Sequence, residues 1–219
     1  MNSEIAKSSL VKVWSVVLAL VASLLVCCNG CGLSSDDSSG VIEQTPPSNQ
    51  TPPAVGAASQ VKPPGPPVDP PDVDMQAAAV FGDVEAVRQH IAAGSDLNEQ
   101  AKDGSSPLIT ATLFGNDEVA KLLIEAGADV NFKNGEGSTP IHTAAFFCRT
   151  EIVVLLLQKG AEKNVRNNNG VTPLESVTAP YEDVVGVYKY LGTALGKLGL
   201  EIDHDRIKAT RPKIAQMLQ

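Results

Sequence analysis

The stretch Ser138-Thr139-Pro140-Ile141-His142-Thr143-Ala144-Ala145 decides the fold, because its Ser/Thr-Pro pair recurs at a fixed spacing along the chain. Ser106-Pro107 precedes Thr139-Pro140, and Thr172-Pro173 follows it at the same distance. The interval is about 33 residues, and a fixed period of roughly 20–50 residues is typical of a stacked repeat architecture. The chain is therefore predicted to be a repeat protein.

Each repeat contains the start and stop signals of two helices. Ser106, Thr139 and Thr172 can each cap a helix whose first residue is a proline, where the missing N–H costs nothing. Apolar runs such as Leu155-Leu156-Leu157 then supply the buried stripe of a second helix. Glycines that suit a left-handed stop follow the second helices, namely Gly94, Gly127 and Gly160. Each unit is therefore predicted to be helix, turn, helix and a glycine-rich return loop.

At this point the residues resemble the ankyrin repeat, over roughly residues 74–178. The first unit lacks the Thr-Pro loop, and the fourth unit loses the pattern after Val177. The resemblance implies an all-α solenoid in which Ser106, Pro107, Thr139, Pro140, Thr172 and Pro173 build the loops and helix starts. It also implies that His142 bonds to the backbone of adjacent loops, which is a structural role. The matching segments are Gly137 to Ala145, Glu151-Ile152-Val153, Leu155-Leu156-Leu157, Gly160-Ala161 and Gly127-Ala128-Asp129-Val130-Asn131.

Composition limits the classes of function. The chain has 219 residues, of which 43% are hydrophobic and 4% aromatic, which allows one modest domain with appendages. Its net charge is −8 and its pI is about 4.9. From residue 74 onward, 14 Lys/Arg stand against 19 Asp/Glu. This acidic balance argues against nucleic-acid binding, which needs a basic face.

Residues 1–31 have the pattern of a signal peptide. Lys7 and Lys12 precede an apolar run from Val13 to Val26, which is shorter than the ~20 residues needed to span a bilayer. The cysteines that follow resemble the lipobox of bacterial lipoproteins, and we favour Cys28 over Cys31 as the lipidated residue. Cys28 has Leu25 three positions before it, whereas Cys31 has the expected small residue, Gly30, just before it. An uncleaved anchor is the alternative.

Residues 32–73 are predicted to be an extended, solvated linker. Ten of the fifteen prolines fall between Pro46 and Pro71, and large apolar side chains are scarce. Such a segment cannot bury enough surface to offset the entropy of ordering. We expect its role to be reach, with a Pro-rich ligand for an aromatic groove as the alternative.

The repeats are expected to span residues 74–180, as about four units, and residues 181–219 to form a helical C-terminal cap. The spacing of Val184, Tyr188, Leu191 and Leu195 predicts an amphipathic helix over residues 181–198 that covers the open end of the stack. Asp203 is expected to cap a short helix through Ile207, and Thr210 a last one through Leu218.

The histidines could in principle carry chemistry. His142 with Ser138 and Glu151 could form a catalytic set, but a helix start does not suggest the geometry of a triad. His204 between two aspartates could attract a metal, but helix capping by Asp203 explains the same residues. We therefore predict no catalytic residue, no metal site and no cofactor.

Aromatic residues form two adjacent columns in the repeat. Phe81, Phe114 and Phe147 are separated by the repeat period, and Val80, Leu113 and Phe146 precede them. In ankyrin repeats these positions face the concave groove, so stacked repeats would align them into an apolar stripe. An exposed stripe would mark a partner site, and packing between neighbouring helices is the alternative. The predicted partner-binding residues are Phe81, Leu113, Phe114, Phe146, Phe147, and Asp103 and Glu136 at the loop tips.

The preferred functional interpretation is a non-enzymatic protein-binding module. The predicted partner is a protein with apolar anchors and basic flanks, bound through the concave face and loop tips. A lipid and a Pro-rich tether would hold the module outside a bacterial inner or outer membrane, on the periplasmic side. Two alternatives remain: an enzyme whose site lies in residues 181–219, and a structural spacer whose concave face is polar and featureless.

Overall fold

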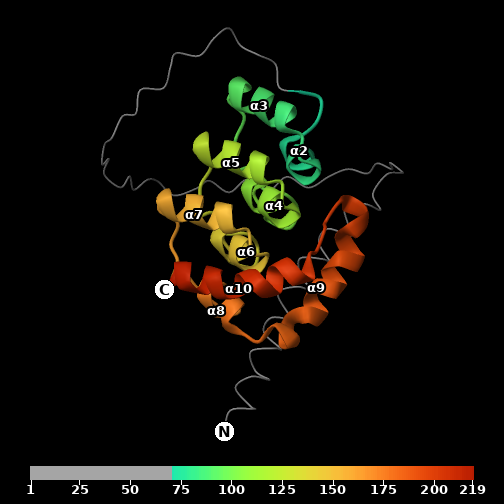
Figure 1. Ribbon diagram of the computed structural model, residues 1–219. Helices are drawn as coiled ribbons and strands as arrows, with labels where there is room; N and C mark the ends of the chain where they lie inside the picture. Colours follow the sequence, from blue (N-terminus) through green and yellow to red (C-terminus); the bar gives the residue numbers. More distant parts are fainter. Residues whose placement is uncertain (1–70) are drawn as a thin grey trace, which may run out of the picture.

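The computed structural model describes residues 71–219, so the predicted signal peptide, Cys28 and nearly all of the linker lie outside the described residues. The described part consists of helices stacked in pairs (Figure 1). None of the helices in residues 71–219 combines the length and apolar character needed to cross a bilayer. The first three pairs are α2 (Met75–Phe81) with α3 (Val84–Ala93), α4 (Pro107–Phe114) with α5 (Asp117–Glu125), and α6 (Pro140–Phe146) with α7 (Thr150–Gln158).

The predicted start signals are found at the first helix of the second, third and fourth units. Helices α4, α6 and α8 (Pro173–Thr178) begin at a proline that follows an extended Ser106, Thr139 or Thr172. The Ser106 hydroxyl accepts a hydrogen bond from the Ile109 N–H, and the Thr172 hydroxyl accepts one from the Glu175 N–H. The first unit lacks this loop, and the carboxylate of Asp74 caps α2 instead.

Left-handed residues end the helices, as predicted. Gly94, Gly127 and Gly160 after the second helices have φ between 74° and 97°. Gly115 ends α4 with φ 79°, and a Cβ there would collide with the guanidinium of Arg149. Cys148 occupies the equivalent position after α6 and adopts φ 54°, a left-handed conformation that L-residues other than glycine seldom take.

One core runs through the stack, between the inner row α2, α4, α6 and the outer row α3, α5, α7. It is built from the apolar stripes of both rows, with small residues such as Ala111 and Ala144 where helices approach closely. Each unit buries its apolar face only against its neighbours. Stability is therefore a sum of unit and interface terms.

The last helix differs from the prediction of two short helices. Residues His204–Leu218 form a single helix, α10, with Pro212 inside it. The Thr210 hydroxyl does not cap a new helix but donates to the carbonyl of Arg206. Helix α10 packs on α8 and α7, in the place of the outer helix of the fourth unit (Figure 1). Burial of Ile207, Ile214 and Leu218 therefore outweighs the helix-breaking effect of the proline.

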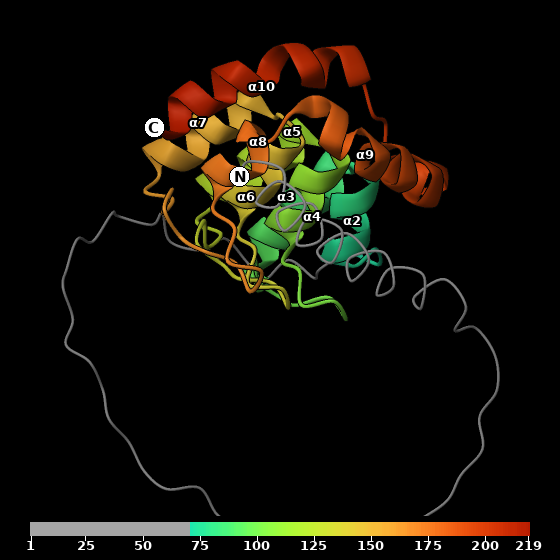
Figure 2. The ribbon, with the colours of Figure 1, turned by 90° about the horizontal axis from the view of Figure 1, so that it is seen from below.

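Helix α9 (Tyr181–Leu195) also differs from the prediction, because α10 and not α9 closes the end of the stack. Helix α9 and the short 3-10 turn η1 (Gly196–Leu198) instead lie along the inner-helix side (Figures 1 and 2). There Val187, Leu191 and Leu195 form a separate apolar cluster with Leu113, Phe114 and Phe147. The apolar spacing of α9 correctly indicates a helix, but the surface predicted for that helix is wrong.

Candidate functional site

A groove with a volume of about 330 Å³ lies on the inner-helix side of the stack. Its apolar lining includes Val80, Ile109 and Leu113, and Leu191 of α9 borders it. Part of its polar lining comes from the return loops, which project together on one side of the molecule (Figure 2). An apolar floor with a few polar groups at the edge is the usual composition of a binding pocket.

The polar edge of the groove is built by the repeat itself. Ser105, Asn134, Ser138 and Asn167 from successive loops line it. The Asn167 amide donates to the Ser138 hydroxyl at 3.2 Å, and the Asn134 carboxamide oxygen accepts from the Ser138 N–H at 2.9 Å. The first bond joins two successive loops and the second orders one of them, so the polar edge of the groove is held together without a partner.

His142 lies beside the groove and is engaged at both ring nitrogens. Its Nε2–H donates to the carbonyl of Val171 in the next loop at 3.1 Å, and its Nδ1 accepts from the Thr139 N–H at 3.2 Å. Burial lowers the pKa of the imidazole, which favours its neutral form. Both nitrogens are thus used to join one repeat to the next. This is the contact with loop backbone that the sequence predicts.

The two predicted acidic loop-tip residues have different surroundings. Asp103 lines the groove, and its carboxylate accepts from the N–H and the hydroxyl of Ser105 at 3.1 and 2.8 Å. Both carboxylate oxygens of Glu136, one repeat further on, are buried without a hydrogen-bond partner among the described residues. Burial and the charge of Asp103 raise the pKa of Glu136 to about 7.

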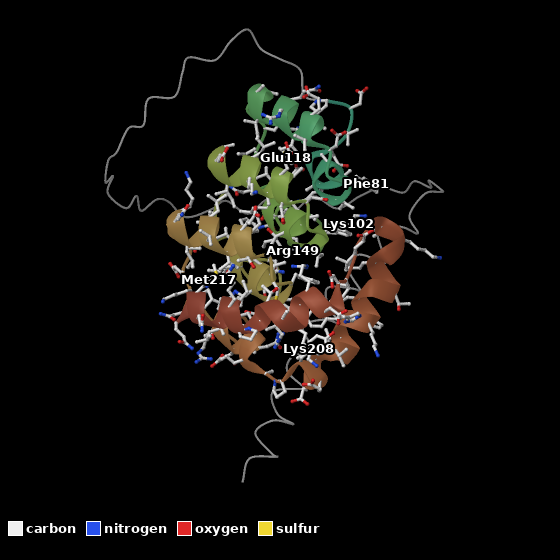
Figure 3. All side chains as sticks on the ribbon, viewed as in Figure 1. Phe81, Lys102, Glu118, Arg149, Lys208 and Met217 are labelled. Atoms are coloured by element: carbon white, nitrogen blue, oxygen red, sulfur yellow. The ribbon has the colours of Figure 1, made fainter. Side chains whose placement is uncertain are left out.

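The predicted aromatic stripe is not continuous on the surface. Phe81 is 71% exposed at the end of α2 (Figure 3), whereas Phe114 and Phe147 are only 6% and 3% exposed. Leu113 is buried with them beneath α9, and half-buried Phe146 lines the groove. Of the two alternatives that the sequence analysis left open, surface exposure is therefore contradicted for Leu113, Phe114 and Phe147, although all three line the groove. The alternative, packing between neighbouring helices of the stack, does not fully describe these residues either, since side chains of α9 also cover them.

Two residues that the sequence analysis did not select secure the C-terminal segment. The Tyr188 hydroxyl donates to the carbonyl of Phe146 at 2.6 Å, and its ring stacks on Phe146 with centroids 4.7 Å apart. Arg211, only 4% exposed, donates to the Tyr188 hydroxyl and to the carbonyls of Ser176 and Ala179. The position of Tyr188 on the apolar stripe indicated burial, but no local signal identified Arg211.

The other residues considered for chemistry are held in structural contacts. The Asp203 carboxylate caps α10, and the Nδ1 of His204 lies 2.6 Å from the Tyr181 hydroxyl. In residues 71–219, no group of three or more His, Cys, Asp or Glu side chains is placed to hold a metal ion. The Cys148 thiol is buried, and burial raises its pKa. These contacts account for the residues without a catalytic role.

Comparison with known proteins identifies the repeat. Residues 75–175 match the family model described as ankyrin repeats, in three copies. No curated protein matches the chain in a comparison of sequences. The fixed repeat period, the paired helices and the return loops agree with that match. Residues 75–175 therefore form ankyrin repeats, which continue into C-terminal helices, and this repeat indicates a protein interaction module.

Proposed function

We propose that the chain is a non-enzymatic module that binds a protein partner in the open part of its concave groove. The observation that carries the proposal is the groove of about 330 Å³, which is lined at the first repeat by Val80, whose neighbour in the chain, Phe81, is exposed. Phe81 is the most exposed of the large apolar side chains in residues 71–219. Such residues are often the anchors of interfaces.

The chemistry of the groove indicates the chemistry of the partner. Apolar side chains would enter between Val80 and Ile109, and a Lys or Arg would meet the carboxylate of Asp103, whose charge also acts on Glu136. A cation beside Glu136 would satisfy its two buried oxygens and allow it to ionise. We therefore propose a partner segment with an apolar anchor and at least one basic flank.

The two alternatives receive less support. A spacer without a dedicated ligand is expected to have a polar and featureless concave face, whereas this groove has an apolar lining. An enzyme with its site in residues 181–219 is expected to have a cleft with titratable groups of that segment. The segment brings apolar Leu191 to the groove. Tyr188, whose pKa burial raises, is occupied by Arg211 and the Phe146 carbonyl.

The proposed location is the periplasmic side of a bacterial inner or outer membrane. This rests on the sequence pattern of residues 1–31, with Cys28 as the lipidated residue, and on the proline-rich residues 32–73 as a tether. A tethered module would search for its partner near the membrane surface. Its repeats need no membrane contact of their own for this role.

The test is site-specific photo-crosslinking in intact cells that produce the full chain. A photoreactive residue at Phe81 is expected to capture a partner that the same group at Val154 does not capture. Val154 is an exposed apolar residue on the outer helix α7, 39% accessible, and is therefore a matched control. Adding Asp103→Lys is expected to abolish the capture. The same capture from both positions, or capture unaffected by Asp103→Lys, would refute this site.

A further inference from the structure

Burial differs sharply within one column of the repeat. Phe81, Phe114 and Phe147 occupy equivalent positions, yet Phe81 is 71% exposed and the other two are at most 6% exposed. The latter two belong to a cluster that is separate from the core of the stack, together with Val187, Leu191, Leu195 and Leu200. Residues from the C-terminal segment thus cover part of a surface that the repeats themselves leave open.

The segment that covers this surface lies between two firm anchors. Before it, the Tyr188 hydroxyl bonds to the Phe146 carbonyl at 2.6 Å. After it, the Arg206 guanidinium donates to the carbonyls of Cys148 and Phe147 at 2.9 and 3.4 Å. We call residues 189–202, between these anchors, the flap. In Figures 1 and 2 the helix that carries most of the flap, α9, runs beside the inner helices.

The flap is attached differently from its anchors. In the part of the chain that the structure describes, no hydrogen bond joins residues 189–202 to the ankyrin repeats. The hydrogen bonds of the flap are internal, for example from the Thr193 hydroxyl to the Lys189 carbonyl and from the Leu200 N–H to the Leu195 carbonyl. Leu191, Leu195 and Leu200 hold it by apolar contact alone. Apolar contact is non-directional, so another apolar surface of similar shape can replace it.

The flap is also a weak helix by itself. Gly192 lies within α9, and Gly196 is the residue directly after the end of α9. Each glycine lowers helix stability relative to alanine. An alanine Cβ at Gly196 would meet no atom within 4 Å, so close packing does not require this glycine. A helical segment this short is marginal in water without a surface to pack on. Release of the flap from the repeats would therefore also melt it.

We propose that the flap is an internal occupant of the concave groove, and that the partner displaces it with an amphipathic helix carrying leucine-type side chains at i and i+4. The proposal rests on the proposed function and specifies its partner. The spacing is that of Val187, Leu191 and Leu195, which already fill the surface over Phe114 and Phe147. The open groove near Phe81 receives the partner first, and the flap then yields the rest of the surface.

The closing experiment uses the flap sequence, extended by two residues to include Val187, as its own probe. A fluorescent peptide of residues 187–202 carrying Gly196→Ala is titrated against the full chain and against the double variant Leu191→Asn/Leu195→Asn. In the unaltered chain the flap is tethered beside its binding surface at an effective concentration of about 1 mM, so it competes strongly with the free peptide for that surface. We expect the double variant to bind the peptide at least ten-fold more tightly than the unaltered chain. Tyr190→Ser, on the exposed side of the same helix, is the matched control and is expected to bind no more tightly than the unaltered chain.

Amide hydrogen exchange on the unaltered chain provides a second measurement that needs no variant. Amides of residues 191–200 are expected to exchange at least ten-fold faster than those of α4 and α6, because the flap opens without unfolding the stack. A folded double variant that gains no affinity would overturn the proposal. If that variant fails to fold, flap exchange as slow as that of α6 would overturn it. Either result leaves the proposed function standing, since that function depends on crosslinking at Phe81.

Discussion

Replacing His142 with alanine tests how strongly one repeat depends on the next. The imidazole is 5% exposed and joins the Thr139 N–H of its own helix start to the Val171 carbonyl of the following loop. Each such bond contributes about 0.5–1.5 kcal/mol, and a buried group left without a partner adds to the cost. We expect His142→Ala to lower the free energy of unfolding by about 1–3 kcal/mol, the range for a buried hydrogen-bonding group that loses its partner.

Urea denaturation followed by circular dichroism measures this change in a single transition, because the units are coupled. His204→Ala, which loses a contact with Tyr181 in the C-terminal segment, is a control expected to cost less than His142→Ala. A shift for His142→Ala smaller than about 0.5 kcal/mol, the least that one hydrogen bond contributes, would refute the bridging role. The pH dependence gives a further check. Burial lowers the pKa of His142 from its ordinary value of 6.5. The contribution of His142 to the free energy of unfolding is therefore present above pH 6.5 and is lost as the pH falls below that value.

Three other predictions concern separate parts of the chain. Glu136→Gln should stabilise the fold above pH 7 by about 1 kcal/mol, a value reduced from full linkage because the carboxyl is partly exposed. The sign follows from a pKa raised to about 7: the folded state favours the protonated form, and stability is lost as the pH rises from 4.5 through 7. Equal melting temperatures for the two proteins at pH 8 would contradict it. Gly186→Ala should raise the free energy of unfolding by about 1 kcal/mol, since the added Cβ would meet no atom within 4 Å and alanine favours the helix. A lower free energy of unfolding in urea would show instead that the glycine is needed. Cys28→Ala should abolish labelling by a radiolabelled fatty acid in bacteria, and labelling that persists until Cys31 is replaced would move the site.

The repeat region could be predicted because its signals are local. Thr-Pro pairs, glycine stops and apolar stripes each depend on a few neighbouring residues, and repetition at a fixed period shows that they belong to one pattern. The contact of His142 with the backbone of an adjacent loop was implied by the resemblance to the ankyrin repeat, and the structure shows it. These elements required no knowledge of distant contacts.

The C-terminal helices could be predicted only in part, because their partners are distant in sequence. Pro212 locally indicates a break, yet it lies inside α10, because Ile207, Ile214 and Leu218 are buried on opposite sides of it. The apolar spacing of α9 predicted a helix with a buried stripe. It did not show that this stripe covers Phe114 and Phe147 rather than the end of the stack.

The sequence by itself determined the ankyrin-repeat solenoid, the positions at which its repeat helices begin and end, and the aromatic column at Phe81, Phe114 and Phe147. Only the tertiary structure decided which of these aromatic residues meet water. Periodicity reports which side chains share a face, because it follows from the geometry of one helix and of one repeat. What covers that face depends on where Tyr188 and Arg206 attach the C-terminal segment to the repeats. Their partners, Phe146 and Phe147, lie far away in the sequence, and no local pattern specifies contacts between such distant residues.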